Sequence, residues 1–293
     1  MKWIIKKEED GMLVRDYLYS VRAFSRRMIK VVKFDGGILV NGIEVRVRHT
    51  LHSGDVLHVS FPPEERGEWL IPEQLPLEVV YEDEHTLVVE KPFGQATIPG
   101  RDHKRGTLAN ALMAYYDRHA YPYTAHIVTR LDRDTSGLVL IAKHRFAHSL
   151  LSEQQVNGAI HRQYYAIVTD EMEESHGTID VPIARHPDSI IRRYVSEEGK
   201  RAVTHYKVVE RKNGHTLVQL KLDTGRTHQI RVHMAYIGHP LIGDDLYGGA
   251  TDKLTRQALH CFSLRYPSPL EESKHQTFEI DLAKDLKDYW KHI

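Results

Sequence analysis

The sequence predicts an α+β fold, in which helices flank a mixed, mainly antiparallel sheet, preceded by a small N-terminal domain. Segments typical of strands outnumber those typical of helices, and the two kinds do not alternate as they would around a parallel sheet. A Pro-rich, acidic stretch at residues 62–77 is typical of a linker. The length of 293 residues suits about two domains. We therefore expect one domain over residues 1–61 and another over 78–293.

The composition sets limits on function. Lys and Arg total 40 and Asp and Glu total 40, so a formal net charge of zero gives no global electrostatic case for binding nucleic acid. The single cysteine, Cys261, excludes an internal disulfide and a Cys-based zinc cluster, and its apolar neighbours indicate a buried thiol. His228 and His233 are five apart, which does not suit one helical face. We expect no metal and no organic cofactor.

Membrane segments are not expected. The longest apolar runs fall far short of the roughly 20 residues that span a bilayer. The first apolar run is also too short for a signal peptide. These features predict a cytoplasmic protein without a membrane partner.

The first domain is expected to contain two helices and a hairpin. Tyr17 and Leu18 lie on the apolar face of the first helix, and Ser25 suits the N-cap of the second. Residues 38–45 form two short strands around an Asn-Gly turn. A last strand is expected from Val56.

The second helix carries a cationic face. Between Tyr17 and Phe34 there is no acidic residue, and there are five basic ones: Arg22, Arg26, Arg27, Lys30 and Lys33. Four of these fall at intervals of four, four and three, which places them on one side of a helix. Met28, Ile29 and Val32 then face inward. Charge spacing alone is equally typical of a phosphate-binding face and of a solvated one.

After the linker, the chain continues with residues 77–84, and a strand is expected at 86–90. Residues 138–142 are five apolar residues bounded by Gly and Lys, which predicts a buried central strand. The remaining helices are expected at 106–116, 146–155 and 226–237, and the remaining strands at 164–168, 202–209 and 216–222.

The octet 130–137, Arg-Leu-Asp-Arg-Asp-Thr-Ser-Gly, comes directly before the predicted central strand. It places Asp132 between two arginines at a loop–strand junction, where a rigid backbone can aim a side chain into a cleft. Taken alone, the octet is also typical of a surface turn with weak local ion pairs.

The octet resembles the signature of the Rlu family of RNA pseudouridine synthases, His-Arg-Leu-Asp-x-x-Thr-Ser-Gly, with Thr129 in place of the His. Residues 162–168 are similar to the family's basic-x-Tyr-x-Ala-x-Val strand. Residues 222–233 and 239–248 resemble its third motif. Three long motifs in order make the resemblance specific.

The resemblance extends over about residues 78–285, and it includes Lys91-Pro92 and His260. It implies the pseudouridine synthase fold, a bent sheet with the active cleft across its middle. Residues 1–61 resemble the alpha-L RNA-binding module that is often fused to RNA-modifying enzymes. This second resemblance favours phosphate binding by the basic helix.

The implied activity is the isomerisation of uridine to pseudouridine in ribosomal or transfer RNA. The reaction breaks the bond from N1 to C1′, turns the uracil and joins its carbon 5 to the sugar. No group is gained or lost, so no cofactor is needed. Asp132 matches the family's aspartate, which implies a carboxylate that captures the sugar, adds to the base or shields a cationic sugar.

The resemblance also implies partners for Asp132. Arg231 is the expected cation, because its planar fork suits a bidentate bond to a carboxylate. Asp134 is the competing carboxylate and ranks second. Arg130 is expected to extrude the nucleotide and fill its place in the stack, with a plain salt bridge as the alternative. Tyr164 is expected to stack on uracil and to assist loss of the carbon 5 proton, with a core aromatic as the alternative.

Further contacts follow from the third motif. Residues 224–227 resemble a helix entry whose backbone N–H groups hold a phosphate, with Arg226 adding charge. Gln229 and Ile230 would border the base pocket. His228 either contacts RNA or braces the motif, and Lys91 is a candidate phosphate contact.

RNA is therefore the expected partner, and nothing in the sequence requires more than a monomer. Two alternatives keep parts of the pattern. One is a non-catalytic RNA-binding or ribosome-assembly factor with the same fold. The other is a nucleoside hydrolase or glycosylase, which shares the carboxylate but does not need the RNA-binding module.

Overall fold

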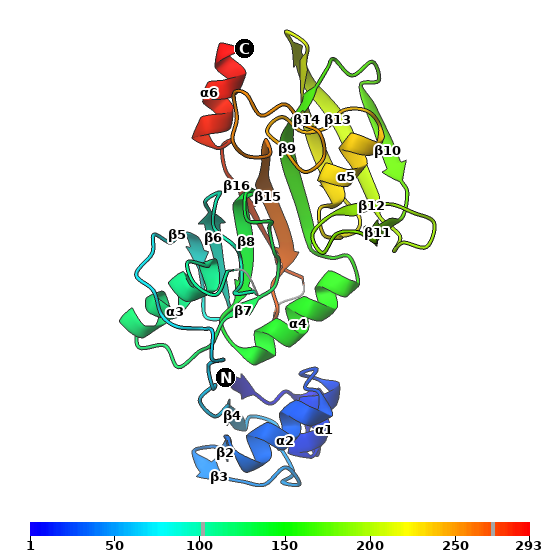
Figure 1. Ribbon diagram of the computed structural model, residues 1–293. Helices are drawn as coiled ribbons and strands as arrows, with labels where there is room; N and C mark the ends of the chain where they lie inside the picture. The colour runs from blue at the N-terminus through cyan, green and yellow to red at the C-terminus, as the bar shows by residue number, and fades with distance from the viewer. Residues whose placement is uncertain (101–102, 271–272) are drawn as a thin grey trace. The chain divides into compact units, whose positions relative to one another are not determined.

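The computed structural model describes residues 1–100, 103–270 and 273–293 and divides the chain into two compact units (Figure 1). The smaller unit contains residues 1–66 with 122–124. The larger unit contains residues 67–121 and 125–293. Among the described residues, none of the helices combines the length and apolarity needed to cross a lipid bilayer.

The smaller unit is a four-stranded antiparallel sheet with two helices. Its strands lie in the order β1-β4-β2-β3. The elements are β1 Lys2–Ile4, η1 Lys7–Glu9, α1 Val14–Ser20, α2 Arg26–Phe34, β2 Gly37–Val40, β3 Ile43–Glu44 and β4 Val56–Ser60. Tyr17 and Leu18 of α1 are fully buried in its core. The predicted cap and turn are confirmed, since Ser25 accepts the Met28 N–H at 3.2 Å and Asn41 has a φ of +52°.

The basic face of α2 differs from the prediction at one residue. Because the helix begins at Arg26, Arg22 lies in the preceding turn and does not share the helix face. Its Nε donates to the Tyr17 hydroxyl at 2.7 Å, and its guanidinium lies 5.4 Å from the ring centre of Trp3. The other four basic residues are exposed. The cationic face therefore consists of Arg26, Arg27, Lys30 and Lys33.

The larger unit contains a ten-stranded mixed sheet in the order β10-β13-β14-β9-β15-β8-β6-β5, with β16 beside β15 and β7 beside β8. Only the β8–β15 pair is parallel among the described strands. The strands are β5 Glu78–Glu82, β6 Thr86–Lys91, β7 His126–Ile127, β8 Ser136–Ala142, β9 His161–Thr169, β10 His176–Asp180, β13 Val203–Lys212, β14 His215–Leu222, β15 Leu259–Pro267 and β16 His275–Glu279. This mixed, largely antiparallel sheet confirms the predicted fold class.

Helices flank this sheet. They are α3 Leu108–Arg118, α4 Arg145–Val156, α5 Gln229–Tyr236 and α6 Lys284–His292. A separate hairpin, β11 Ile183–Arg185 with β12 Arg193–Val195, lies beside α5 (Figure 1). The helix that was predicted from residue 226 begins instead at Gln229, and Gly238 follows its end with a φ of +87°.

The predicted central strand is confirmed: every residue of β8 is buried. At its start, Gly137 has a φ of +115°, and a Cβ there would lie 2.2 Å from the Cys261 carbonyl oxygen of β15. Only glycine fits where these two strands meet. Cys261 is fully buried, and burial raises the pKa of its thiol to about 12, which makes it inert.

The segment predicted as a linker is partly packed in the larger unit. Asn110 of α3 donates its side-chain N–H groups to the carbonyls of Trp69 and Ile71 at 3.0 and 2.8 Å. The Glu73 N–H donates to the Asn110 carbonyl at 3.1 Å. These bonds fix residues 69–73 against α3, so this part of the segment has a defined structure.

Candidate active site

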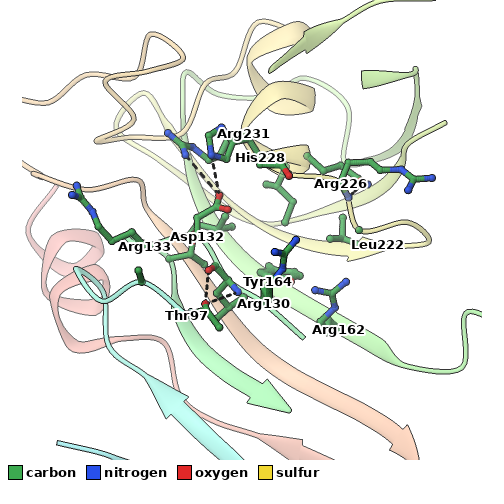
Figure 2. Close-up of a pocket in the computed structure, with 18 of the residues that line it drawn as sticks. Thr97, Arg130, Asp132, Arg133, Arg162, Tyr164, Leu222, Arg226, His228 and Arg231 are labelled. Atoms are coloured by element: carbon green, nitrogen blue, oxygen red, sulfur yellow. Dashed lines mark hydrogen bonds and ion pairs between the residues drawn. The ribbon is translucent and has the colours of Figure 1, made fainter. Parts of the chain in front are cut away.

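Asp132 lies in a pocket of about 420 Å³ within the larger unit (Figure 2). The pocket is formed by the loop before β8, the start of β9, the turn before α5 and the segment around Thr97. Thr129, at the position of the family His, does not line it. Its buried hydroxyl accepts the Leu140 N–H at 2.9 Å, which is a structural contact.

The loop that carries Asp132 is fixed on both sides of the aspartate. Thr97 Oγ1 donates to the Leu131 carbonyl at 2.7 Å and lies 3.3 Å from the Leu131 nitrogen. On the other side, Lys91 Nζ donates to the Arg133 carbonyl at 3.0 Å and to two further carbonyls, of Pro92 and Gln95, at 2.8 Å. These bonds hold the Asp132 backbone rigidly at the pocket wall.

The prediction that Lys91 contacts a phosphate is wrong. Its side chain is fully buried at the end of β6, and burial lowers its pKa to about 7. Three carbonyl oxygens already occupy its ammonium group. Lys91 is thus a structural support for the Asp132 loop.

Arg231 of α5 faces Asp132, as predicted, but its bidentate bond is made elsewhere. Nη1 lies 3.7 Å from Asp132 Oδ2, while Nε and Nη2 donate to the two carboxylate oxygens of Asp244 at 2.7 and 2.8 Å. Asp244 is fully buried, so its charge needs a close partner. We expected a bidentate bond between Arg231 and Asp132, but the structure shows a single ion pair between them.

His228 is the second group that faces Asp132. It is the N-cap of α5 with a φ of +57°, and its Nε2 lies 4.0 Å from Asp132 Oδ2. Its Nδ1 lies 2.8 Å from the Tyr247 hydroxyl. Burial lowers the pKa of His228, so the imidazole is neutral near pH 7. Of the two predicted roles, the geometry favours bracing.

The turn before α5 is less open to a phosphate than the sequence predicted, because one of its backbone N–H groups is already bonded. Gln229 Oε1 accepts from the Arg226 N–H at 2.9 Å and from the Thr224 hydroxyl at 2.8 Å. The same side chain donates to the Val203 carbonyl at 2.9 Å. Gln229 takes one of the backbone donors of residues 224–227, and its buried amide braces the turn. Gln229 and Ile230, both buried, line the pocket as predicted.

The opposite wall of the pocket is cationic (Figure 2). Arg130 and Arg226 line it, together with Arg162 of β9, which the sequence analysis did not single out. A Cβ on Gly225 would lie 2.7 Å from Arg162 Nη2, so glycine leaves room for this guanidinium. The sequence does contain an indication of this role. Arg162 lies two residues before Tyr164 on the same strand, so the two side chains share one face.

Tyr164 lines the pocket and its neighbour Tyr165 does not. Tyr165 stacks on Phe262, with ring centres 4.0 Å apart. This is the opposite orientation that strand alternation predicts. Burial raises the pKa of Tyr164, so its hydroxyl is protonated near pH 7.

Asp134 does not line the pocket. It pairs with its neighbour Arg133 at 3.0 Å, and Arg130 makes no ion pair among the described residues. The salt bridge considered between Arg130 and Asp134 is thus not formed. Asp132 is the only carboxylate in the described lining, which carries five arginines: Arg130, Arg133, Arg162, Arg226 and Arg231.

The pocket combines one carboxylate with an excess of guanidinium groups. An anionic ligand would be attracted to it, while Asp132 would keep a negative charge close to that ligand. No group of three or more His, Cys, Asp or Glu residues suited to a metal ion occurs in the part of the chain that the structure describes.

Comparisons with known proteins identify the family of this chain. The family model described as RNA pseudouridylate synthase matches residues 85–236. An uncharacterized RNA pseudouridine synthase of Bacillus subtilis is 48% identical over 276 residues, which are 94% of this chain and 97% of that protein. Ribosomal large subunit pseudouridine synthase D of Pseudomonas aeruginosa is 44% identical over 249 residues, 80% of this chain and 77% of that one.

A solved structure shares the fold. Human RNA pseudouridylate synthase domain containing 1 superposes with a TM-score of 0.60 at 26% identity, covering 74% of this chain and 86% of the human one.

Proposed function

Since this chain belongs to the RNA pseudouridine synthase family, we propose that it isomerises uridines in the RNA of the large ribosomal subunit, with Asp132 as the catalytic carboxylate. The single observation that supports the role of Asp132 is its position in the pocket, 3.7 Å from a guanidinium that is itself buried. The choice of ribosomal RNA rests on relatives named for the large subunit.

Asp132 would act at the sugar of the target nucleotide. Breaking the bond from N1 to C1′ leaves positive charge on the sugar, which an ionised carboxylate stabilises by bonding to C1′ or by shielding it. His228 Nε2 and Arg231 Nη1 lie 4.0 and 3.7 Å from Oδ2 of Asp132. When carbon 5 of the turned uracil bonds to C1′, any bond from the carboxylate to C1′ breaks and Asp132 is again ionised. Carbon 5 loses its proton and N1 gains one, so the product has the same composition as the uridine.

The target uridine would leave its stack to enter the pocket. Arg130 has no ion pair among the described residues, so its planar guanidinium is available to fill the vacated position. The Tyr164 ring would stack on the uracil beside Ile230. Because the Tyr164 hydroxyl is protonated, it can accept the carbon 5 proton only after giving up its own.

Phosphates of the target strand would lie along the cationic wall. Arg162 and Arg226 line this wall, and among the described residues neither makes an ion pair. Such phosphate contacts position RNA without reading its sequence.

Residues 1–61 would add affinity as an alpha-L RNA-binding module. The supporting observation is the face of α2 with Arg26, Arg27, Lys30 and Lys33 exposed. Arg22, which packs on Trp3 and Tyr17, would support this module from within.

Charge reversal on α2 tests this part of the proposal. Arg26→Glu with Lys30→Glu is expected to weaken RNA binding and to lower the slope of log affinity against log salt by about 1–2, because two phosphate contacts are lost. The control is Lys284→Glu with Lys291→Glu on α6, which changes the net charge equally. Binding measured over a salt series gives both slopes. Equal slopes for the α2 variant and the unaltered protein would contradict the module's role.

All the residues proposed here for catalysis belong to one chain, which supports the proposal of a monomer. The relatives named as ribosomal-RNA enzymes come from bacteria, which supports the proposal that this enzyme is cytoplasmic.

Mapping of pseudouridines in cellular RNA, with and without this protein, tests the substrate. We expect one or a few uridines of the large-subunit RNA to lose modification and to regain it with the unaltered protein but not with Asp132→Asn. A loss confined to transfer RNA would overturn the choice of substrate.

A further inference from the structure

Tyr247 lies behind both groups that face Asp132. Its hydroxyl is 2.8 Å from His228 Nδ1, and its ring centre is 5.0 Å from the Arg231 guanidinium carbon. The two rings of Tyr247 and His228 meet edge to face, with an interplanar angle of 83°. Tyr247 does not line the pocket itself. It therefore reaches the substrate only through these two neighbours.

The hydrogen-bond partners of the Tyr247 hydroxyl indicate which group donates in its bond to His228. The Arg193 backbone N–H, at the start of β12, donates to the Tyr247 oxygen at 2.9 Å. Of the residues that the structure describes, only Arg193 and His228 hydrogen bond to this hydroxyl. An N–H cannot accept, so among the described residues the Tyr247 proton has one acceptor, the Nδ1 of His228. A neutral imidazole that accepts at Nδ1 carries its hydrogen at Nε2.

The other tautomer would be unfavourable on both sides of the ring. With the hydrogen at Nδ1, two donors would converge on the Tyr247 oxygen and the hydroxyl proton would lose its acceptor. The bare Nε2 lone pair would then face the Asp132 carboxylate, 4.0 Å away. With the hydrogen at Nε2, an N–H dipole points toward that negative charge.

We propose that Tyr247 is a positioning residue, which holds His228 in the Nε2–H tautomer so that a neutral imidazole presents a donor to the Asp132 carboxylate. The inference rests on the proposed function of Asp132 and extends it. The positive charge of Arg231 stabilises the ionised carboxylate of Asp132. His228 offers that carboxylate a second N–H donor without adding a cation to the pocket. The present Nε2–Oδ2 separation exceeds a hydrogen bond, but such contacts often shorten when substrate binds.

The hairpin β11–β12 anchors this arrangement. Because the Tyr247 hydroxyl accepts the Arg193 N–H, the position of the hairpin determines where the His228 ring lies. Tyr247 thus orients His228, which in turn faces the catalytic carboxylate. Hydrogen bonds from residues outside a metal site orient the metal's ligands in the same way.

Removing the hydroxyl alone tests the proposal. In single-turnover assays with RNA that carries tritium at carbon 5 of uridine, Tyr247→Phe is expected to lower the rate about 10-fold, the equivalent of one lost hydrogen bond. The KM for RNA should stay within about twofold, because Tyr247 does not touch the substrate. The Phe ring keeps the contact with Arg231, and a melting curve checks that the fold is retained.

A double-mutant cycle separates positioning from a general structural effect. If Tyr247 acts through His228, Tyr247→Phe should change the rate less than about twofold in a His228→Ala background. Independent, multiplying effects would overturn the proposal. So would an unchanged rate for Tyr247→Phe in an enzyme preparation whose unaltered form is active. Absence of activity in the unaltered form would instead refute the proposed function.

The chain contains a matched control. Tyr289 of α6 places its hydroxyl 3.0 Å from His215 Nε2, with the rings 5.9 Å apart at 73°, and neither residue lines the pocket. Tyr289→Phe removes the same kind of bond and is expected to leave the rate unchanged. A loss as large as that of Tyr247→Phe would contradict the specific role of Tyr247.

The tautomer can be observed directly. Nitrogen-15 NMR of histidine-labelled protein distinguishes protonated from bare ring nitrogens, and His228→Ala identifies the His228 signals by their loss. We expect the Nε2–H form in the unaltered protein and a mixture of both forms in Tyr247→Phe. An Nδ1–H form in the unaltered protein would overturn the proposal.

Discussion

Asp132→Asn is expected to lower turnover by at least about 10⁴-fold, the scale of losing a catalytic nucleophile. Asparagine keeps the size of the side chain but cannot carry the negative charge that the cationic sugar requires. The fold should be retained, because Arg231 keeps its bidentate bond to Asp244 and the loop keeps its bonds to Lys91 and Thr97. Tritium release from carbon 5 of uridine in RNA measures turnover directly.

Asp134→Asn is the matched control for this variant. It removes a carboxylate two residues away that pairs with the exposed Arg133 side chain and does not line the pocket. An exposed ion pair contributes only about 0–1 kcal/mol, so activity should stay near that of the unaltered enzyme. Near-normal turnover of Asp132→Asn, or a greater loss with Asp134→Asn, would refute the assignment of the catalytic carboxylate.

Asp244→Ala is expected to lower the free energy of unfolding by about 3–5 kcal/mol, since it leaves the buried Arg231 without its main counter-ion. Asp244 is fully buried, and the Arg231 side chain is only 7% exposed. Freed from the fork, Arg231 would also lose the orientation that directs Nη1 at Asp132. Turnover should therefore fall together with stability.

Urea denaturation measures the first effect and tritium release the second. Asp245→Ala provides the control, because this neighbouring aspartate is exposed and should change stability by less than about 0.5 kcal/mol. A change below about 1 kcal/mol for Asp244→Ala would show that the buried pair does not stabilise this part of the fold.

Local patterns predicted much of the fold. The apolar run of β8 marked a central strand because five buried residues leave no polar face for solvent. Ser25 and the Asn-Gly turn were identifiable because their backbone bonds are made within a few residues. The resemblance to the Rlu family implied that Asp132, Tyr164 and Arg231 share one site, and the pocket brings all three together.

The same local patterns could not predict contacts between residues that are far apart in the sequence. The partner of the Arg231 fork depends on Asp244 being buried beside it, which spacing along the chain does not reveal. Lys91 was misassigned because lysines are rarely buried, and only the tertiary structure shows the three carbonyls that hold it. In the turn before α5, the bond from the Arg226 N–H to the Gln229 side chain was likewise not visible in the sequence.

The most direct test of the central claim is a crystal structure of Asp132→Asn bound to its unmodified RNA. We predict that the target uridine lies outside its stack, with C1′ within about 3.5 Å of the residue 132 side chain, the distance of a reactive contact. A uridine that stays stacked in the RNA, or one that enters the pocket with C1′ directed away from residue 132, would contradict the account.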